Sequence, residues 1–121
     1  SLQGKPAVLN FWASWCTSCI KEMPDFQAVA TELKDKVTIV GFDLLGVDGE
    51  SESVARSFAT GRGVAYPLAF DERGLLYAHF SQRTVIPTTI FVDAQGIVTY
   101  RKFGPLSRSE LRAAIREHLN V

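Results

Sequence analysis

The feature that most constrains the fold lies in residues 7–19, where a continuous apolar run is followed closely by a Cys-x-x-Cys spacing. The run at residues 7–12 is typical of a strand buried on both faces. A helix that begins after Cys16 would place its sulfur among unpaired backbone N–H groups, whose partial positive charge favours thiolate over thiol. Because the thiolate is the species that attacks disulfides, this placement indicates a redox-active pair of Cys16 and Cys19.

The composition fits one soluble globular domain. A chain of 121 residues, 46% hydrophobic and 21% charged, can bury a core of its own. Its 13 basic and 13 acidic residues give a net charge of zero, which argues against binding to nucleic acid or to a membrane surface. No apolar run approaches the roughly 18 residues of a membrane span. We therefore expect a single domain over residues 1–121, trimmed at its N-terminus, since the chain starts at Ser1 and not at Met.

Hydrophobic periodicity predicts alternating strands and helices. The expected strands are residues 7–12, 37–43, 68–70, 88–93 and 97–103, and the expected helices are residues 17–33, 51–61, 75–80 and a last helix after a capping box at Ser107 and Glu110. Pro24 lies inside the first helix and predicts a kink there. This order predicts an α/β fold, with a central mixed sheet of four to five strands flanked by helices and a ββα C-terminal end.

Two separate segments resemble the thioredoxin superfamily, and within it the TlpA/ResA/DsbE-like branch of extracytoplasmic thiol-disulfide oxidoreductases. Residues 4–19 are similar to the first strand and active site of that branch, and residues 85–96 to its second signature. Glu22 and Pro24 resemble its Glu-x-Pro after the second cysteine. The resemblance implies a thioredoxin fold, with a cis peptide bond before Pro87 and with Pro87 facing the cysteines.

Three residues are the candidate catalytic groups. Cys16 is the expected nucleophile, and Cys19, one helical turn later, is the expected resolving thiol. Glu22 shares a helical face with Cys19, so its carboxyl group would raise cysteine pKa values when charged or shuttle a proton when neutral. Asn10 stands where cytosolic thioredoxins carry a buried, titrating Asp, which leaves Glu22 as the remaining candidate acid. The alternative for Glu22 is an ordinary solvated position on the helix.

Trp15, Ile86 and Pro87 are the candidate substrate-binding residues. Trp15 is expected to form a partly exposed apolar lip beside the nucleophile, whereas Trp12 is expected in the core. The resemblance implies that the backbone of Ile86 pairs with an extended substrate peptide, which is strand addition on a small scale. The alternative is a strand-edge proline without that role. The acidic segment at residues 48–52 is expected to be a solvated turn.

The predicted function is thiol-disulfide exchange with protein substrates, which requires no organic cofactor and no metal. The resemblance implies a reductant that acts on apocytochrome c or another envelope protein with paired cysteines. It further implies a membrane thiol-disulfide carrier as electron donor, a location outside the cytoplasm, and an N-terminal anchor that this chain does not contain. We expect a monomer and no binding to nucleic acid.

Other uses of the cysteine pair fit the sequence less well. Zinc usually takes four ligands, and neither His79 nor His118 has ligand spacing. Haem attachment needs a histidine where Ile20 stands. A peroxiredoxin-like peroxidase would carry a threonine at the position of Ala13. A non-catalytic redox switch or binding module on the same scaffold is the alternative from another functional class.

Overall fold

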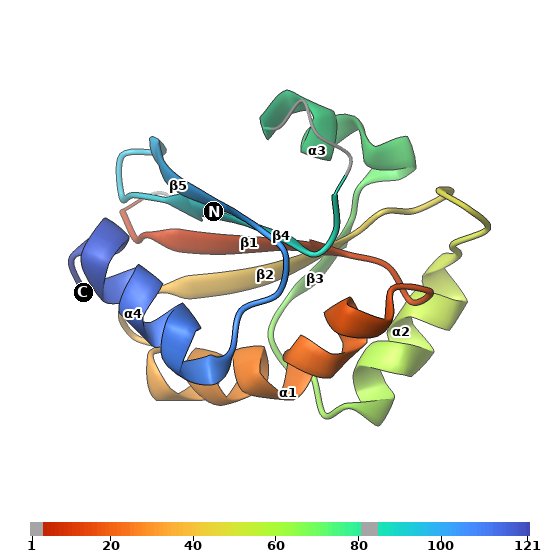
Figure 1. Ribbon diagram of the computed structural model, residues 1–121, viewed down its shortest axis with the longest axis horizontal. Helices are drawn as coiled ribbons and strands as arrows, with labels where there is room; N and C mark the ends of the chain where they lie inside the picture. Colours follow the sequence, from red (N-terminus) through yellow and green to blue (C-terminus); the bar gives the residue numbers. More distant parts are fainter. Residues whose placement is uncertain (1–3, 81–84) are drawn as a thin grey trace.

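A mixed five-stranded sheet forms the centre of the molecule, with the strands in the order β3-β2-β1-β4-β5 (Figure 1). The computed structural model describes residues 4–80 and 85–121. The strands are β1 (Ala7–Trp12), β2 (Thr38–Asp43), β3 (Leu68–Phe70), β4 (Thr88–Val92) and β5 (Val98–Phe103). β2 is parallel to β1 and β3, while β4 is antiparallel to β1 and β5. The predicted mixed sheet is confirmed.

The helices cover both faces of this sheet. They are α1 (Thr17–Glu32), α2 (Glu52–Gly61), the 3-10 turn η1 (Glu72–Gly74), α3 (Leu75–Phe80) and α4 (Arg108–Leu119). Figure 1 shows α1, α2 and α4 on one side of the sheet and α3 on the other. Each predicted helix is confirmed to within a residue or two. α1 continues through Pro24, and the kink expected there stays a prediction. Within residues 4–80 and 85–121, no helix is long and apolar enough to cross a membrane.

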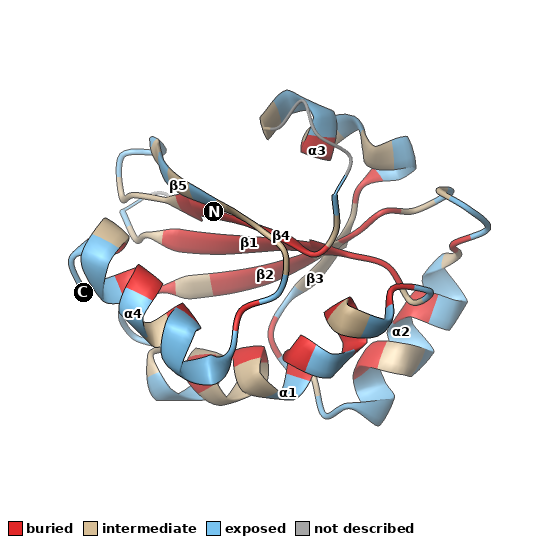
Figure 2. Ribbon diagram, viewed as in Figure 1, coloured by how far each residue is buried: buried red, intermediate tan, exposed pale blue. Residues whose placement is uncertain are grey.

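β1 is buried along its whole length, as its continuous apolar sequence predicts (Figure 2). Its side chains alternate between the two faces of the sheet. Val8 packs with Phe26 of α1, and Trp12 packs in a cluster with both cysteines. Phe11 points to the opposite face, where it contacts Tyr77 of α3. Asn10 therefore lies on the face that carries α1, although it is polar.

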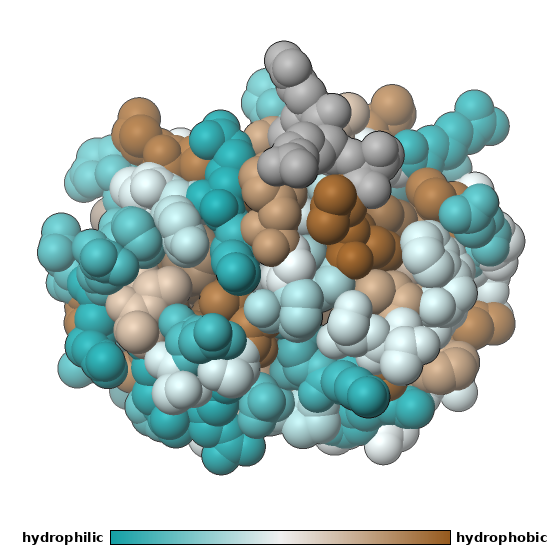
Figure 3. Space-filling model, in the orientation of Figure 1, coloured by the Kyte–Doolittle hydropathy of each residue, from teal (hydrophilic) through white to brown (hydrophobic). Residues whose placement is uncertain are grey.

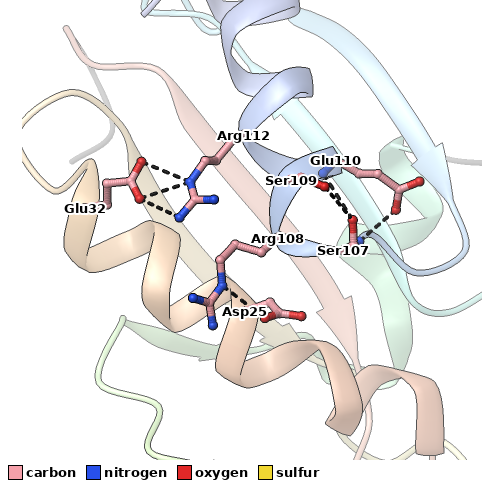
Figure 4. A network of polar contacts seen from close by, with 7 residues as sticks. All are labelled: Asp25, Glu32, Ser107, Arg108, Ser109, Glu110 and Arg112. Carbon is pink, nitrogen blue, oxygen red and sulfur yellow. Dashed lines mark hydrogen bonds and ion pairs between the residues drawn. The ribbon is translucent and has the colours of Figure 1, made fainter.

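α4 packs on α1 and fixes the C-terminal part of the chain against the site. Leu111 and Ile115 of α4 are buried in the same cluster as Phe26. The predicted capping box is confirmed, since the side chains of Ser107 and Glu110 each accept from the other's backbone N–H (Figure 4). Ion pairs join the exposed surfaces of the two helices, Arg108 with Asp25 at 3.2 Å and Arg112 with Glu32 at 2.7 Å (Figure 4). Exposed ion pairs contribute little, so apolar packing holds α4 in place.

Candidate active site

Cys16 and Cys19 are joined as a disulfide at the N-terminus of α1, with their Cα atoms 5.3 Å apart. β1 ends at Trp12, and a turn closed by the hydrogen bond from the Cys16 N–H to the Ala13 carbonyl (3.1 Å) leads into the helix. Cys16 is the N-cap, and its Sγ accepts from the Cys19 N–H at 3.3 Å. Cys16 is 8% exposed and Cys19 is fully buried. One sulfur is thus near the surface and the other behind it.

Glu22 is buried, so the solvated alternative is wrong. Its side chain is 4% exposed. One carboxylate oxygen accepts from the Asn10 side-chain amide at 2.9 Å, and the other accepts from the Leu106 N–H at 2.9 Å. Burial raises the pKa of Glu22 to about 7, with a small further rise from the negative charge of Asp25, while the two hydrogen bonds act in the opposite direction. A carboxyl group of this kind can take up or release a proton near neutral pH.

Asn10 connects Glu22 to the sheet. Its amide N–H₂ also donates to the hydroxyl of Thr89 on β4 at 3.2 Å. The side-chain amide of Asn10 has both an N–H₂ donor and a carbonyl acceptor. It can therefore donate a hydrogen bond to a charged Glu22 or, after rotation of the amide, accept one from a protonated Glu22. Glu22 is also among the residues that line a surface hollow of about 280 Å³. The residues that line this hollow include Ser18, Lys21, Pro105 and Leu106. Protons can therefore reach Glu22 from solvent.

The segment around Pro87 lies against the cysteine pair. The Ile86–Pro87 peptide bond is cis, as the resemblance implied. Ile86 is partly buried and packs against the cluster that contains Trp12, Cys16 and Cys19. Pro87 is buried, and its carbonyl accepts from the Gly104 N–H at 2.8 Å. Two segments some 70 residues apart in the sequence are thereby brought together.

Tyr77 on α3 anchors this segment, a role that the sequence patterns did not indicate. Its hydroxyl donates to the Val85 carbonyl at 2.5 Å and accepts from the Val85 N–H at 2.9 Å. The same hydroxyl lies 3.2 Å from that of Thr88, which itself donates to the Val85 carbonyl. The Asp71 carboxylate accepts from the backbone N–H groups of Leu76 and Tyr77 and so fixes the start of α3. A buried tyrosine in a short helix carries no sequence signal for this contact.

Trp15 forms the expected lip, and Trp12 is in the core. Trp15 is 45% exposed, while Trp12 is fully buried. The indole N–H of Trp15 donates to the Val47 carbonyl at 3.0 Å, which holds the ring beside Cys16. Val85 is exposed as well. Figure 3 shows hydrophobic surface near the middle of the visible face, bordered by hydrophilic residues.

The expectation of a solvated turn at residues 48–52 is wrong for Glu50, which is 5% exposed. One of its carboxylate oxygens accepts from the Ser14 N–H at 2.6 Å, and the other accepts from the Ser14 hydroxyl. Asp43, the last residue of β2, is fully buried nearby. Its position could have been noticed, since it is an acid at the carboxyl end of an apolar strand whose parallel neighbour leads to the cysteines. Glu50 became buried only because the loop folds back onto Ser14.

The comparisons with known proteins agree with this geometry. The AhpC/TSA family model matches residues 1–101, which include both cysteines, Glu22 and Pro87. The chain belongs to the AhpC/TSA family. Sporulation thiol-disulfide oxidoreductase A of Bacillus subtilis is 29% identical over 111 residues. That match covers 91% of this chain and 66% of the relative, so the chain spans just under two thirds of the relative's length.

Solved structures of similar chains share the fold. The structure of MTB dsbF, described in mixed oxidized and reduced forms, is 33% identical, with a TM-score of 0.83 and coverage of 96% of this chain and 82% of that one. A secreted Mycobacterium tuberculosis disulfide oxidoreductase is 28% identical, with a TM-score of 0.81 and coverage of 96% and 84%. These similarities confirm the predicted thioredoxin fold. They also confirm the predicted resemblance to thiol-disulfide oxidoreductases.

Proposed function

We propose that this chain is a thiol-disulfide oxidoreductase that exchanges disulfides with protein substrates through Cys16 and Cys19. One observation carries the proposal. Cys16, which is close to the surface, caps the N-terminus of α1, and Cys19 is buried one helical turn further on. In the reduced protein, a Cys16 thiolate would accept the hydrogen bond that its Sγ now accepts from the Cys19 N–H. The helix N-terminus favours that charge.

The reaction has two balanced steps. The Cys16 thiolate attacks one sulfur of a substrate disulfide, which forms a mixed disulfide and releases the other substrate sulfur as a thiolate. The Cys19 thiolate then attacks the Cys16 sulfur, so the Cys16–Cys19 disulfide forms and the second substrate sulfur leaves as a thiolate. Two electrons pass from the cysteine pair to the substrate. Protons lost by Cys16 and Cys19 are taken up by the two substrate thiolates.

Glu22 is the proposed proton acceptor for Cys19. The two residues are three positions apart on α1 and both are buried, and side chains at this spacing lie next to each other on a helix. A carboxyl group with a pKa of about 7 is matched to proton transfer at neutral pH. When ionised, Glu22 also opposes negative charge on a nearby sulfur, which favours a reducing pair. We therefore propose the reducing direction.

The exposed ring of Trp15 and the segment at Val85, Ile86 and Pro87 are the proposed substrate-binding surface. Trp15 offers apolar contact area beside the nucleophile, and Ile86 packs against the cluster that contains the cysteines. The proposed substrates are proteins outside the cytoplasm with paired cysteines, with apocytochrome c as the candidate from the family resemblance and a membrane thiol-disulfide carrier as the electron donor. One structural neighbour is itself named as secreted.

Reduction of the insulin disulfides by dithiothreitol tests the proposed activity. The wild-type protein should accelerate the reaction, and Cys16→Ser should abolish the acceleration. Equal rates with wild type and Cys16→Ser would reject the proposal. Peroxide consumption measured on the same samples tests the peroxidase alternative, which predicts activity there. A reduction potential below about −220 mV would agree with a reductant, whereas one near about −120 mV would indicate an oxidant.

A further inference from the structure

We propose that Asp43 and Glu50 form a proton-sharing carboxyl pair that positions the turn at Ser14 and Trp15, and with it the reactivity of Cys16. This inference rests on the proposed thiol-disulfide exchange and assigns two positioning residues to it. Neither residue belongs to the segments that resemble the family's active site, and neither is on α1.

Glu50 is the direct anchor of the turn. Both of its carboxylate oxygens accept hydrogen bonds from Ser14, one from the backbone and one from the hydroxyl. Ser14 lies two residues before the nucleophile, in the turn that ends at Cys16. Hydrogen bonds to a charged acceptor are about twice as strong as neutral ones. The backbone that delivers Cys16 to α1 is therefore tied to a carboxylate from another part of the chain.

The same loop holds Trp15. The Val47 carbonyl accepts from the Trp15 indole, and Val47 also accepts from the backbone N–H of Glu50 at 3.1 Å. Glu50 in turn accepts from the Gly46 N–H at 3.0 Å, which closes the loop on itself. A movement of Glu50 would thus be passed to both residues that precede Cys16.

Asp43 is fully buried within reach of Glu50, and no N–H or O–H of residues 4–80 and 85–121 donates to either of its carboxyl oxygens. Beyond the effect of burial, the Glu50 carboxyl group acts on Asp43, and both its hydrogen bonding and its charge raise the Asp43 pKa. Two carboxyl groups can share a hydrogen bond only when one of them is protonated. Burial and the adjacent Glu50 raise the pKa of Asp43 to about 9. At neutral pH a neutral Asp43 therefore donates to the Glu50 carboxylate.

The other charged groups around the pair leave this proton sharing intact. The Asp71 carboxylate faces the backbone N–H groups of Leu76 and Tyr77 at the start of α3. The Arg73 side chain is exposed. The contact of Arg73 with the loop after β2 is a hydrogen bond from its backbone N–H to the Leu45 carbonyl at 2.7 Å. Asp48 and Glu52 are exposed, and Trp12, opposite Asp43 on β1, carries no charge. Among the ion pairs of the described residues, none includes Asp43 or Glu50.

Loss of the shared proton would release the turn. Two negative charges side by side in a buried site repel each other strongly. Glu50 lies in a loop outside the sheet, whereas Asp43 is held in the sheet by its pairing with β1, so we expect Glu50 to be the group that moves. The Ser14 hydrogen bonds and the Trp15 contact would then weaken together. The pair in its singly protonated form is the state that holds Cys16 in place.

The direct test uses the oxidised protein, in which the cysteines do not titrate. The ¹³C resonances of the Asp43 and Glu50 carboxyl groups are followed from pH 5 to about pH 10.5. In wild type the Asp43 resonance should shift in one step near pH 9, and the Glu50 resonance should respond to that step as its hydrogen-bond partner changes. In Asp43→Asn, whose amide can still donate to Glu50, that step should vanish. A wild type without the step, or an Asp43→Asn variant that retains it at Glu50, would overturn the proposal.

The kinetic test measures insulin reduction and Cys16 alkylation in the same variants. Glu50→Ala should slow both by about tenfold at pH 7, because the turn loses its anchor. Asp43→Asn should stay within about twofold of wild type at pH 7 and lose the change in alkylation rate near pH 9. Glu52→Gln, an exposed acid at the start of α2, is the matched control and should leave both unchanged. Wild-type rates in Glu50→Ala would contradict the inference. Failure of wild type to reduce insulin would remove the proposed function only, since the carboxyl titration and the alkylation do not depend on it.

Discussion

The buried carboxylate of Glu22 accepts a 2.9 Å hydrogen bond from the side-chain amide of Asn10, across the interface between α1 and β1. Asn10 on β1 cannot titrate, and the buried acid of this pair is Glu22 on α1. The Asn10 amide donates a hydrogen bond to the Glu22 carboxylate. The helix that carries both cysteines therefore also carries a buried acid, three residues after Cys19.

Glu22 should make stability depend on pH. Its pKa in the folded protein, about 7, lies above its ordinary value of 4.5. The stabilisation of the protonated group is therefore fully present below about pH 4.5 and is lost as the pH rises through 7. Relative to Glu22→Gln, oxidised wild type should lose roughly 3 kcal/mol between pH 4 and pH 8. Urea unfolding at several pH values measures this, and parallel curves for the two proteins would contradict it. Glu52→Gln serves as the control.

Glu22→Gln should also change the reactivity of the reduced protein. In its proposed role the Glu22 carboxylate opposes thiolate formation, and the substitution removes that negative charge. The pH profile of thiol alkylation should shift to lower pH, with a rate at pH 7 roughly fivefold above that of wild type. Iodoacetamide labelling followed by mass spectrometry measures the profile at each cysteine. An unchanged profile would reject a role for Glu22 in thiol ionisation.

Tyr77→Phe should loosen the segment that carries Ile86 and Pro87. The substitution keeps the ring against Phe11 but removes the hydroxyl that bonds to both backbone groups of Val85. Thr88 still donates to the Val85 carbonyl, so the substitution leaves the Val85 N–H without its partner and should cost about 1 kcal/mol in the free energy of unfolding. Amide hydrogen exchange at Val85 should accelerate by more than exchange in α4. Equal protection of the Val85 amide in both proteins would show that Tyr77 does not hold this segment.

Ser107→Ala should destabilise the C-terminal helix. The Ser107 hydroxyl caps α4 by accepting from the Glu110 N–H at 3.2 Å, and loss of an N-cap typically costs about 1 kcal/mol. Because Leu106 directly precedes the cap and its N–H bonds to Glu22, the same change should alter the titration of Glu22. Thermal unfolding and the ¹³C shift of the Glu22 carboxyl group report the two effects. Ser53→Ala, in the first turn of α2, is the comparison that should change neither.

Much of the fold could be predicted from the sequence because its signals are local. The burial of β1 follows from its unbroken apolar run, and the start of α4 follows from Ser107 and Glu110. The Cys-x-x-Cys spacing of Cys16 and Cys19 is itself enough to predict a redox-active pair. The cis bond at Pro87 was expected only from the resemblance, since a lone proline is seldom cis.

The contacts around the cysteines could not be predicted in the same way. The buried Glu22 carboxylate accepts hydrogen bonds from Asn10, 12 residues away in the sequence, and from Leu106, 84 residues away. The partner of Glu50 is 36 residues away, and an acidic loop with glycines usually points to solvent. Such contacts depend on how the elements assemble, and no local pattern records them. Within a single sequence, an acidic residue that will be buried looks the same as one that will be solvated.

Trapping of the mixed disulfide tests the central claim most directly. Reduced Cys19→Ala is mixed with a peptide that contains a disulfide, and the intact mass is measured after quenching with acid. The account predicts one stable covalent adduct, located at Cys16 by peptide mapping, and none that persists in wild type, where Cys19 resolves it. No adduct in Cys19→Ala, or an equal adduct at Cys19 in Cys16→Ser, would contradict the assignment of Cys16 as the attacking thiol.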